Sequence, residues 1–346
     1  SLELGELALY GTADGGTQPA LLDLSPGGIG VAGADALFDE QEVIPAERSY
    51  LTSSYFDEIY HARTAYEHIR GVYPYEVSHP PLGKLLIGLG IRAFGMTPFG
   101  WRFVGTLFGV LMLPLLYLFL KNLFGKTPLA LCGTSLFAFD FMHLTQTRIA
   151  TIDTYAVFFT LAMYFFLWRF LSLPAGTPFR RCAPSLLLSG LMFGLGAACK
   201  WTVLYGGAGM AVLYAVNLWQ KRRDWPGELT GPTFASWAGK TVLFSVLAFV
   251  VLPLCVYVAA YLPYAQARGD TSLSNLLTIV WENQKFMFTY HRGVDATHPY
   301  ASKWWQWMLD LRPILYYREH TAAGLKSAFA AFNNPVVSWL GLLCMG

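Results

Sequence analysis

The sequence predicts an all-α protein that crosses a membrane several times. Of its 346 residues, 54% are hydrophobic and only 13% are charged, and the mean hydropathy is +0.40. Soluble domains usually carry about 25% Asp, Glu, Lys and Arg, because a surface that faces water has to be solvated. The low charge fraction therefore excludes a soluble enzyme and indicates that much of the surface faces lipid.

Net charge, cysteines and missing motifs exclude further classes of protein. The net charge of +2 provides no broad basic field that would attract nucleic acid. The five cysteines are scattered without any C-x-x-C spacing, so we expect neither a disulfide framework nor a metal site. The sequence also lacks a G-x-x-x-x-G-K-[ST] loop, an external Asp-x-Asp pair and an H-E-x-x-H motif. These absences argue against a nucleotide-driven pump, a sugar-nucleotide donor and a zinc protease.

The two ends of the chain differ from its middle. Residues 1–46 are predicted to be the end of an external domain followed by a linker, because four leucines in the first nine residues alternate like a strand and the remainder is rich in Gly, Pro, Asp and Ala. Residues 332–346 begin an apolar run that stops short of the roughly 20 residues needed to cross a bilayer. We therefore expect a short β-containing remnant at the start and a truncated further span at the end.

Residues 47–263 are predicted to contain a first external loop and about six membrane spans, and residues 264–331 a long external loop. The apolar segments cover residues 103–120, 128–145, 154–171, 185–199, 201–219 and 241–263. Lys200 interrupts one long apolar run. If the chain turns there, every cluster of Lys and Arg falls on one side, and short positively charged loops stay in the cytoplasm. The sequence thus predicts a multi-pass plasma-membrane protein whose other polar residues lie on the extracytoplasmic side.

Adjacent acids stand at the start of a short amphipathic segment that is predicted to lie at the membrane surface. Asp57 and Glu58 cannot share one helix face, so one can point into a site while the other faces solvent or a salt bridge. A carboxylate at the membrane edge suits general-base chemistry, because partial loss of hydration raises its pKa. The structural alternative is a solvated helix start, since acids are common in first turns.

Three cations occur where helices are predicted to meet the outer surface. Lys84 follows His79 and two prolines, and its ammonium could hold a lipid-linked phosphate or simply extend to the interface. Arg148 lies in a short outer turn with Asp153, and its guanidinium could bind a phosphate with two hydrogen bonds or pair with Asp153. Lys200 occupies a second outer turn of the same kind.

The predicted external loop contains a dense aromatic stretch at residues 298–307. Such a stretch is typical of an aromatic belt at the membrane interface. Sugars also stack on Trp and Tyr rings, and long loops usually have a function. Both interpretations remain open from the residues alone.

In this order and topology, these groups resemble the protein O-mannosyltransferase family of the GT-C class of integral membrane glycosyltransferases. The resemblance spans roughly residues 50–317. It is carried by Phe56-Asp57-Glu58, His79-Pro80-Pro81-Leu82-Gly83-Lys84, Arg148 with Ile152-Asp153, Lys200-Trp201, His298-Pro299-Tyr300, Trp304-Trp305 and Arg312-Pro313. It implies a GT-C fold with external loops and interfacial helices, and a first segment that is similar to the end of a β-domain found in some bacterial members.

The resemblance also implies an activity: transfer of mannose from a polyprenyl-phosphate carrier to Ser or Thr hydroxyls of a translocated protein, with inversion at the anomeric carbon. Asp57 and Glu58 would be the catalytic residues, with Asp57 as the base. Carrier phosphate would be bound by Arg148, Lys84 and Lys200, and sugar or acceptor by His79, Asp153, His298, Tyr300, Trp304, Trp305 and Arg312. The implied partners are the lipid-linked donor, the acceptor protein, membrane lipid and the secretion machinery, with no metal and no cofactor.

Two other functions are compatible with the same residues. Close relatives of the family move sugars from a lipid carrier onto lipid A, a cell-wall polymer or another glycan, and the motifs do not separate these acceptors from protein. A transporter of lipid-linked sugars would belong to another class. Against it, the polar residues gather near the outer face, whereas alternating-access sites lie near the middle of the membrane.

Overall fold

A computed structural model of the protein describes residues 8–12, 19–22, 41, 44, 49–226, 233–295, 301–320 and 326–345. The chain divides into two compact units. Unit 1 comprises Ser1–Phe56 and Leu315–Ala330, and unit 2 comprises Asp57–Ile314 and Ala331–Gly346. The predicted membrane spans and most of the predicted site belong to unit 2.

Unit 1 contains short β-structure. Strands β1 (Leu9–Thr12) and β2 (Pro19–Leu22) pair in antiparallel register, and β3 (Ile314–His320) pairs with β4 (Lys326–Ala331). The expected β-containing segment at the start of the chain is therefore confirmed. Strand β2 lies in a stretch for which the sequence predicts only a loop or linker, and the second sheet lies in the predicted external loop. The sequence did not indicate β2, β3 or β4, because none of them alternates apolar and polar residues strictly.

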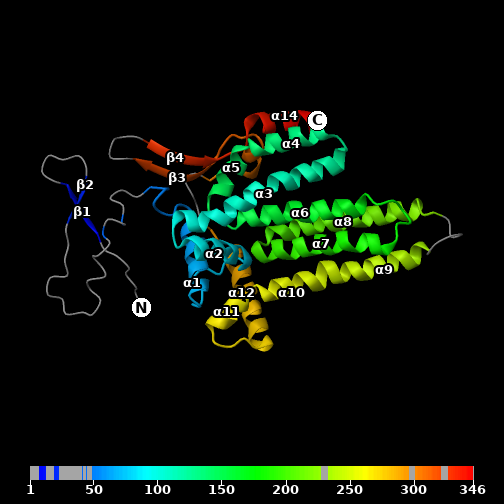
Figure 1. Cartoon of the computed structure of the whole chain (residues 1–346), viewed down its shortest axis with the longest axis horizontal. Helices are drawn as coiled ribbons and strands as arrows, with labels where there is room; N and C mark the ends of the chain where they lie inside the picture. The colour runs from blue at the N-terminus through cyan, green and yellow to red at the C-terminus, as the bar shows by residue number, and fades with distance from the viewer. Residues whose placement is uncertain are drawn as a thin grey trace. The chain divides into compact units, whose positions relative to one another are not determined.

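Unit 2 is helical (Figure 1). Its helices are α1 (Glu58–Ile69), α2 (Leu82–Phe94), α3 (Pro98–Phe124), α4 (Thr127–Ala138), α5 (Phe141–Arg148), α6 (Asp153–Leu171), α7 (Phe179–Cys199), α8 (Thr202–Arg223), α9 (Phe234–Val246), the π-helical turn η3 (Leu247–Val251), α10 (Leu252–Ala259), α11 (Leu262–Ala267), α12 (Leu273–Gly293), α13 (Trp304–Met308) and α14 (Pro335–Met345). Helices α6, α7 and α8 lie side by side, with α9 and α10 against α7 and α3 against α6.

Five helical segments among the described residues are long and apolar enough to cross a membrane: α3, α6, α7, α8 and the continuous run Phe234–Ala267. The sequence predicted about six. The segment predicted at residues 128–145 is divided into α4 and α5, because the Asp140 carboxylate accepts a hydrogen bond from the His143 backbone N–H at 3.0 Å and so starts a new helix. Helices α4 and α5 together run back alongside α3 (Figure 1).

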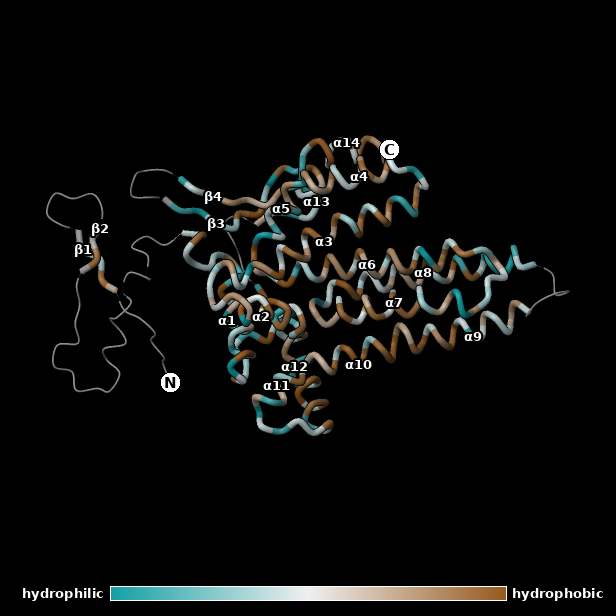
Figure 2. The backbone as a smooth tube through the Cα atoms, viewed as in Figure 1, coloured by the Kyte–Doolittle hydropathy of each residue, from teal (hydrophilic) through white to brown (hydrophobic). Residues whose placement is uncertain are grey.

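The turn predicted at Lys200 is confirmed, since α7 ends at Cys199 and α8 begins at Thr202. Figure 2 shows that α3, α9 and α10 are hydrophobic along most of their length. Many of their large apolar side chains are exposed, including Leu107, Val110, Leu243 and Leu254. Lipid covers such a surface favourably, so the packing agrees with the membrane prediction.

Apolar packing joins the ends of the spans that lie beside α1 and α2. Ala65 of α1, Ile87 of α2, Trp101 of α3 and Tyr155 of α6 belong to one buried apolar cluster. Helix α2 approaches the turn before α6 closely, because Gly83 has no side chain: a Cβ there would lie 2.7 Å from the Ile152 side chain. The cluster therefore holds the starts of α1, α2 and α6 together.

Candidate active site

A polar cavity of about 780 Å³ lies between the start of α1, the segment of residues 75–79 and the end of α12. Its lining consists of Asp57, Tyr60, His61, Tyr75, Glu76, Val77, Ser78, His79, Phe286, Tyr290, His291 and Val294. Carboxylates and imidazoles alternate with aromatic rings on its walls. Rings of this kind suit the faces of a sugar, and the polar groups suit its hydroxyls.

The two adjacent acids have different surroundings, as predicted. Asp57 is the N-cap of α1 and lines the cavity. Glu58 is fully buried, and its carboxylate accepts hydrogen bonds from Nε and Nη2 of Arg102, both at 2.7 Å, and from the Ala150 backbone N–H at 3.0 Å. Glu58 therefore joins α1 to α3 and to the turn before α6. This geometry favours a positioning role for Glu58 over contact with a substrate, and its assignment as a catalytic residue stays a prediction.

The electrostatic surroundings of Asp57 make its carboxylate a stronger base. Partial burial raises the pKa of Asp57, the negative charge of Asp153 raises it further, and the positive charge of Lys200 opposes this rise. The negative charge of Glu76 adds a smaller increase. A general base is more effective when its pKa lies closer to the working pH, so these groups suit Asp57 for proton abstraction.

Asp153 and Lys200 form an ion pair between the starts of α6 and α8. Lys200 Nζ lies 2.6 Å from Asp153 Oδ1, and the two side chains are 23% and 42% exposed. The sequence suggested Arg148 as a partner of Asp153, whereas the ion pair in the structure joins Asp153 to Lys200. Arg148 is the last residue of α5 and is exposed. Both cations lie at the ends of helices and are at least partly exposed, so both remain candidates for binding a phosphate.

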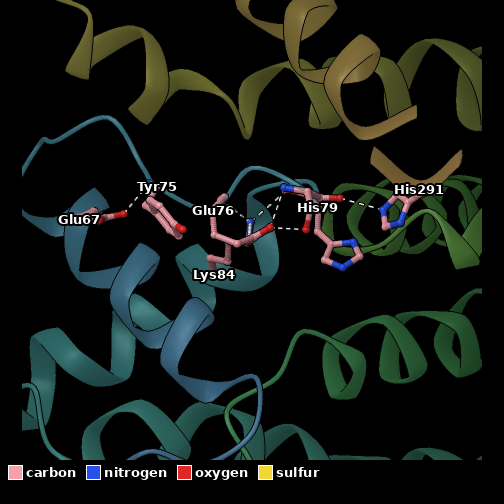
Figure 3. A network of polar contacts seen from close by, with 7 residues as sticks. Glu67, Tyr75, Glu76, His79, Lys84 and His291 are labelled. Carbon is pink, nitrogen blue, oxygen red and sulfur yellow. Dashed lines mark hydrogen bonds and ion pairs between the residues drawn. The ribbon is translucent and has the colours of Figure 1, made fainter. Parts of the chain in front are cut away.

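Lys84 has a different environment. Its side chain is fully buried, it forms an ion pair with the Glu76 carboxylate, and it donates to the backbone carbonyls of Glu76 at 2.9 Å and His79 at 3.3 Å (Figure 3). The ammonium points into the protein, whereas the sequence placed it at the level of the lipid headgroups. Phosphate binding by Lys84 stays a prediction that this geometry does not favour.

Three histidines from three different elements meet at the cavity. The ring of His79 lies 6.4 Å from that of His61 in α1 and 5.1 Å from that of His291 in α12, measured between centroids. Burial and the nearby lysines lower the pKa of His61 to about 4 and of His79 to about 3. Both rings are therefore neutral near pH 7. A neutral imidazole both donates and accepts a hydrogen bond, as recognition of sugar hydroxyls requires.

None of the described residues in the aromatic stretch of the predicted external loop lines this cavity. His298 and Tyr300 lie outside the described residues. Helix α13 packs near α14, since the Trp307 carbonyl accepts from Asn333 and the Leu309 carbonyl accepts from the Trp339 indole. The lining includes none of the other predicted residues from this stretch, namely Trp304, Trp305 and Arg312. Their roles in binding sugar or acceptor stay predictions.

Sequence reasoning missed several lining residues. Glu76 and Ser78 directly precede His79, so polar residues beside the Pro-Pro pair were a local signal. His291 had no local signal: its Nε2 lies 3.0 Å from the Ser78 carbonyl oxygen, across 213 residues of sequence. Phe286 and Tyr290 reach the cavity through the same helix. Only the tertiary packing of α12 reveals these contributions.

The apolar spans and the polar cavity at one end of them define an integral membrane protein of GT-C type. Two solved structures share this fold. The S. cerevisiae protein O-mannosyltransferase Pmt1-Pmt2 complex bound to the sugar donor gives a TM-score of 0.55 at 24% identity, covering 62% of this chain and 31% of that one. ArnT from Cupriavidus metallidurans in the apo state gives 0.52 at 14% identity, covering 73% and 42%.

The chain belongs to the dolichyl-phosphate-mannose-protein mannosyltransferase family, whose model matches residues 93–267. A model of the C-terminal four-transmembrane region of protein O-mannosyltransferase matches residues 276–346. Similar proteins include polyprenol-phosphate-mannose–protein mannosyltransferases of Mycobacterium tuberculosis, 28% identical over 77% of this chain, and Corynebacterium glutamicum, 25% identical over 76%. The chain spans 58% of the length of each.

Proposed function

We propose that this chain carries the reaction centre of a mannosyltransferase that moves mannose from a polyprenyl-phosphate carrier to Ser or Thr hydroxyls of proteins. The observation that carries the proposal is the position of Asp57: its carboxylate lines a polar cavity and lies within the field of the accessible cation Lys200. The names of the similar proteins support the donor and the acceptor class.

The proposed reaction is a single inverting displacement. The Asp57 carboxylate accepts the proton of the acceptor hydroxyl while the hydroxyl oxygen forms a bond to the anomeric carbon of mannose. The bond from that carbon to the phosphate oxygen breaks, and the carrier phosphate leaves with the electron pair. Lys200 and Arg148 stabilise the charge that develops on the phosphate, and such electrostatic stabilisation contributes strongly to catalysis.

We place this reaction on the extracytoplasmic side of the plasma membrane. Helices α6 and α8 begin beside Asp153 and Lys200, near the cavity, and carry Arg169 and a cluster at Lys221 in their last turns. Short loops rich in Lys and Arg are retained in the cytoplasm. The cavity is therefore expected at the opposite face, where a translocated acceptor would arrive. Coupling to the secretion machinery is part of the same prediction.

The variant Asp57→Asn tests the base assignment. We expect it to insert and fold like the unmodified protein and to lose transfer by roughly a hundredfold to ten-thousandfold, which is the usual contribution of a general base. The assay measures transfer of labelled mannose from polyprenyl-phosphate-mannose to a Ser/Thr peptide in reconstituted vesicles. Asp224→Asn, in an exposed pair at the end of α8, is the matched control and should keep full activity.

Near-full activity of Asp57→Asn would refute the assignment of the base. Mass spectrometry of the products then tests the acceptor. Mannose on a Ser or Thr side chain supports the proposal. Sugar found only on lipid A, a cell-wall polymer or another glycan would overturn the protein acceptor, and movement of the carrier without sugar transfer would favour a transporter.

A further inference from the structure

One wall of the cavity is an irregular segment, residues 75–79, which we call the strap. All five of its residues line the cavity, yet none belongs to a helix or a strand. Irregular backbone has no repeating hydrogen bonds of its own, so other groups must satisfy its polar atoms and hold its shape. The contacts of the strap therefore determine where the His79 ring lies.

A single buried lysine holds the strap from within. Lys84 Nζ contacts the Glu76 carboxylate and donates to the carbonyl oxygens of Glu76 and His79, at 2.9 and 3.3 Å. The Glu76 carboxylate in turn accepts from the Ser78 backbone N–H at 2.6 Å and from the Ser78 hydroxyl. Figure 3 draws Glu76, Lys84 and His79 close together, with dashed lines for these contacts. The pair thus bonds the strap at residues 76, 78 and 79.

The outer contacts of the strap come from two helices. Glu67 of α1 accepts a hydrogen bond from the Tyr75 backbone N–H at 2.7 Å. His291 of α12 lies with Nε2 3.0 Å from the Ser78 carbonyl oxygen (Figure 3). These contacts hold the strap at residues 75 and 78, while Lys84 and Glu76 hold it against the start of α2.

The charge state of the pair is compatible with this role. Burial opposes ionisation of Glu76, but the charge and hydrogen bond of Lys84, together with the Ser78 hydroxyl, outweigh it and lower the pKa of Glu76 to about 2. A buried ion pair contributes little net stability, because loss of hydration offsets the attraction between the charges. Its directional bonds do, however, fix the geometry of groups around it.

We propose that Glu76 and Lys84 are positioning residues that hold the strap and thereby place His79 beside His61 and His291 for recognition of the donor sugar. This inference rests on the proposed function. It assigns Lys84 a role different from phosphate binding, because the three protein acceptors around its ammonium occupy the directions in which a phosphate would bind. Neutral His79 contacts the sugar, and Lys84 acts on the reaction only through the strap.

The two roles of Lys84 predict different kinetics. A lost phosphate ligand weakens donor binding, so the donor KM rises. A lost positioning residue leaves the phosphate contacts in place and misaligns the sugar, so kcat falls while the donor KM changes little. We expect Lys84→Met and Glu76→Gln each to lower kcat at least tenfold with a donor KM within about threefold of the unmodified protein.

The experiment uses the protein in lipid nanodiscs and adds a readout that does not depend on activity. Hydrogen exchange of the backbone amides of residues 75–79 reports on the strap, because the Ser78 amide is bonded to Glu76. We expect faster exchange in Lys84→Met and Glu76→Gln, and unchanged exchange and kinetics in the control Arg223→Gln, whose exposed pair with Asp224 lies at the end of α8. The double variant Glu76→Gln/Lys84→Met, which buries no unpaired charge, covers the case in which a single variant fails to fold.

The outcomes separate the hypotheses. Faster exchange in the strap with a lower kcat, in either a single or the double variant, supports the positioning role. Unchanged exchange, or a donor KM raised more than tenfold at constant kcat, would overturn it and return Lys84 to phosphate binding. If the unmodified protein transfers no mannose, the proposed function fails, while the exchange data still test whether the pair holds the strap.

Discussion

The surroundings of Lys84 and Lys200 differ, although the sequence predicts the same role for both. Lys84 lies in the first turn of α2, and its side chain is fully buried against three acceptors on the strap. Lys200 lies between α7 and α8, where it forms an ion pair with Asp153, and its side chain is 23% exposed. Both stand at the start of an apolar helix beside the same cavity. The Lys84 ammonium bonds to groups of the protein, whereas the Lys200 ammonium is accessible to a ligand.

The comparison shows that the motif around a cation does not reveal whether its charge is available. Lys84 is enclosed because the segment before it folds back over it and supplies acceptors from residues 76 and 79. Lys200 remains accessible because the chain leaves α7 and enters α8 within two residues, too short a turn to cover it. Whether a lysine ammonium can bind a ligand therefore depends on how the neighbouring backbone folds around it.

The largest difference should appear in stability. Lys84→Met leaves the buried Glu76 carboxylate without its partner, and loss of one member of a buried pair costs about 3–5 kcal/mol. Lys200→Met breaks a partly exposed pair and should cost about 1 kcal/mol or less. Thermal unfolding of both variants in the same detergent measures the two losses. Equal losses of unfolding free energy in the two variants would contradict the difference between the surroundings of the two lysines.

The donor KM should change in the opposite order, more for Lys200→Met than for Lys84→Met. A hydrogen bond to a charged group contributes about 1.5–3 kcal/mol, so Lys200→Met is expected to raise the donor KM by about tenfold or more. Titration of polyprenyl-phosphate-mannose at a saturating peptide concentration measures this change. Lys240→Met, an exposed position in α9, is the control and should leave the donor KM unchanged. An unchanged donor KM for Lys200→Met would remove Lys200 from the phosphate site.

The smallest expected effect is a shift in the pH profile. Asp57 acts as a base only when ionised, so kcat/KM falls as the pH decreases through the pKa of Asp57. Lys200 lowers this pKa and Asp153 raises it. Lys200→Met should therefore move the acid limb to higher pH, and Asp153→Asn should move it to lower pH. Profiles of kcat/KM for the two variants measure the shifts, and shifts in the same direction would contradict the assignment of the limb to Asp57.

Much of the fold could be predicted because membrane spans have a strong one-dimensional signal. Long apolar runs and the sidedness of Lys and Arg located α3, α6, α7, α8 and the turn at Lys200. The division of one predicted span into α4 and α5 depends on the N-cap at Asp140. A hydropathy average over many residues does not detect a single capping residue. Strands β2, β3 and β4 do not alternate apolar and polar residues strictly, so no period of two indicated them.

The site could be predicted only in part. Asp57, His79 and the separation of Asp57 from Glu58 followed from local sequence, and the structure brings Asp57 and His79 to one cavity. The contributions of His291 and Tyr290 depend on α12, which reaches the cavity from more than two hundred residues away. The partner of Glu58 is Arg102, 44 residues further along the chain, and no pattern in the sequence indicated that pair.

The sequence by itself determined that the protein is helical, lies in a membrane and carries its unusual acids, histidines and isolated cations near one face. It could do so because hydropathy and charge act residue by residue along the chain. The tertiary structure alone decided which of these groups face the cavity and which bind each other. That choice depends on how the strap, α1 and α12 pack, since burial and hydrogen-bond partners are properties of segments that meet in space.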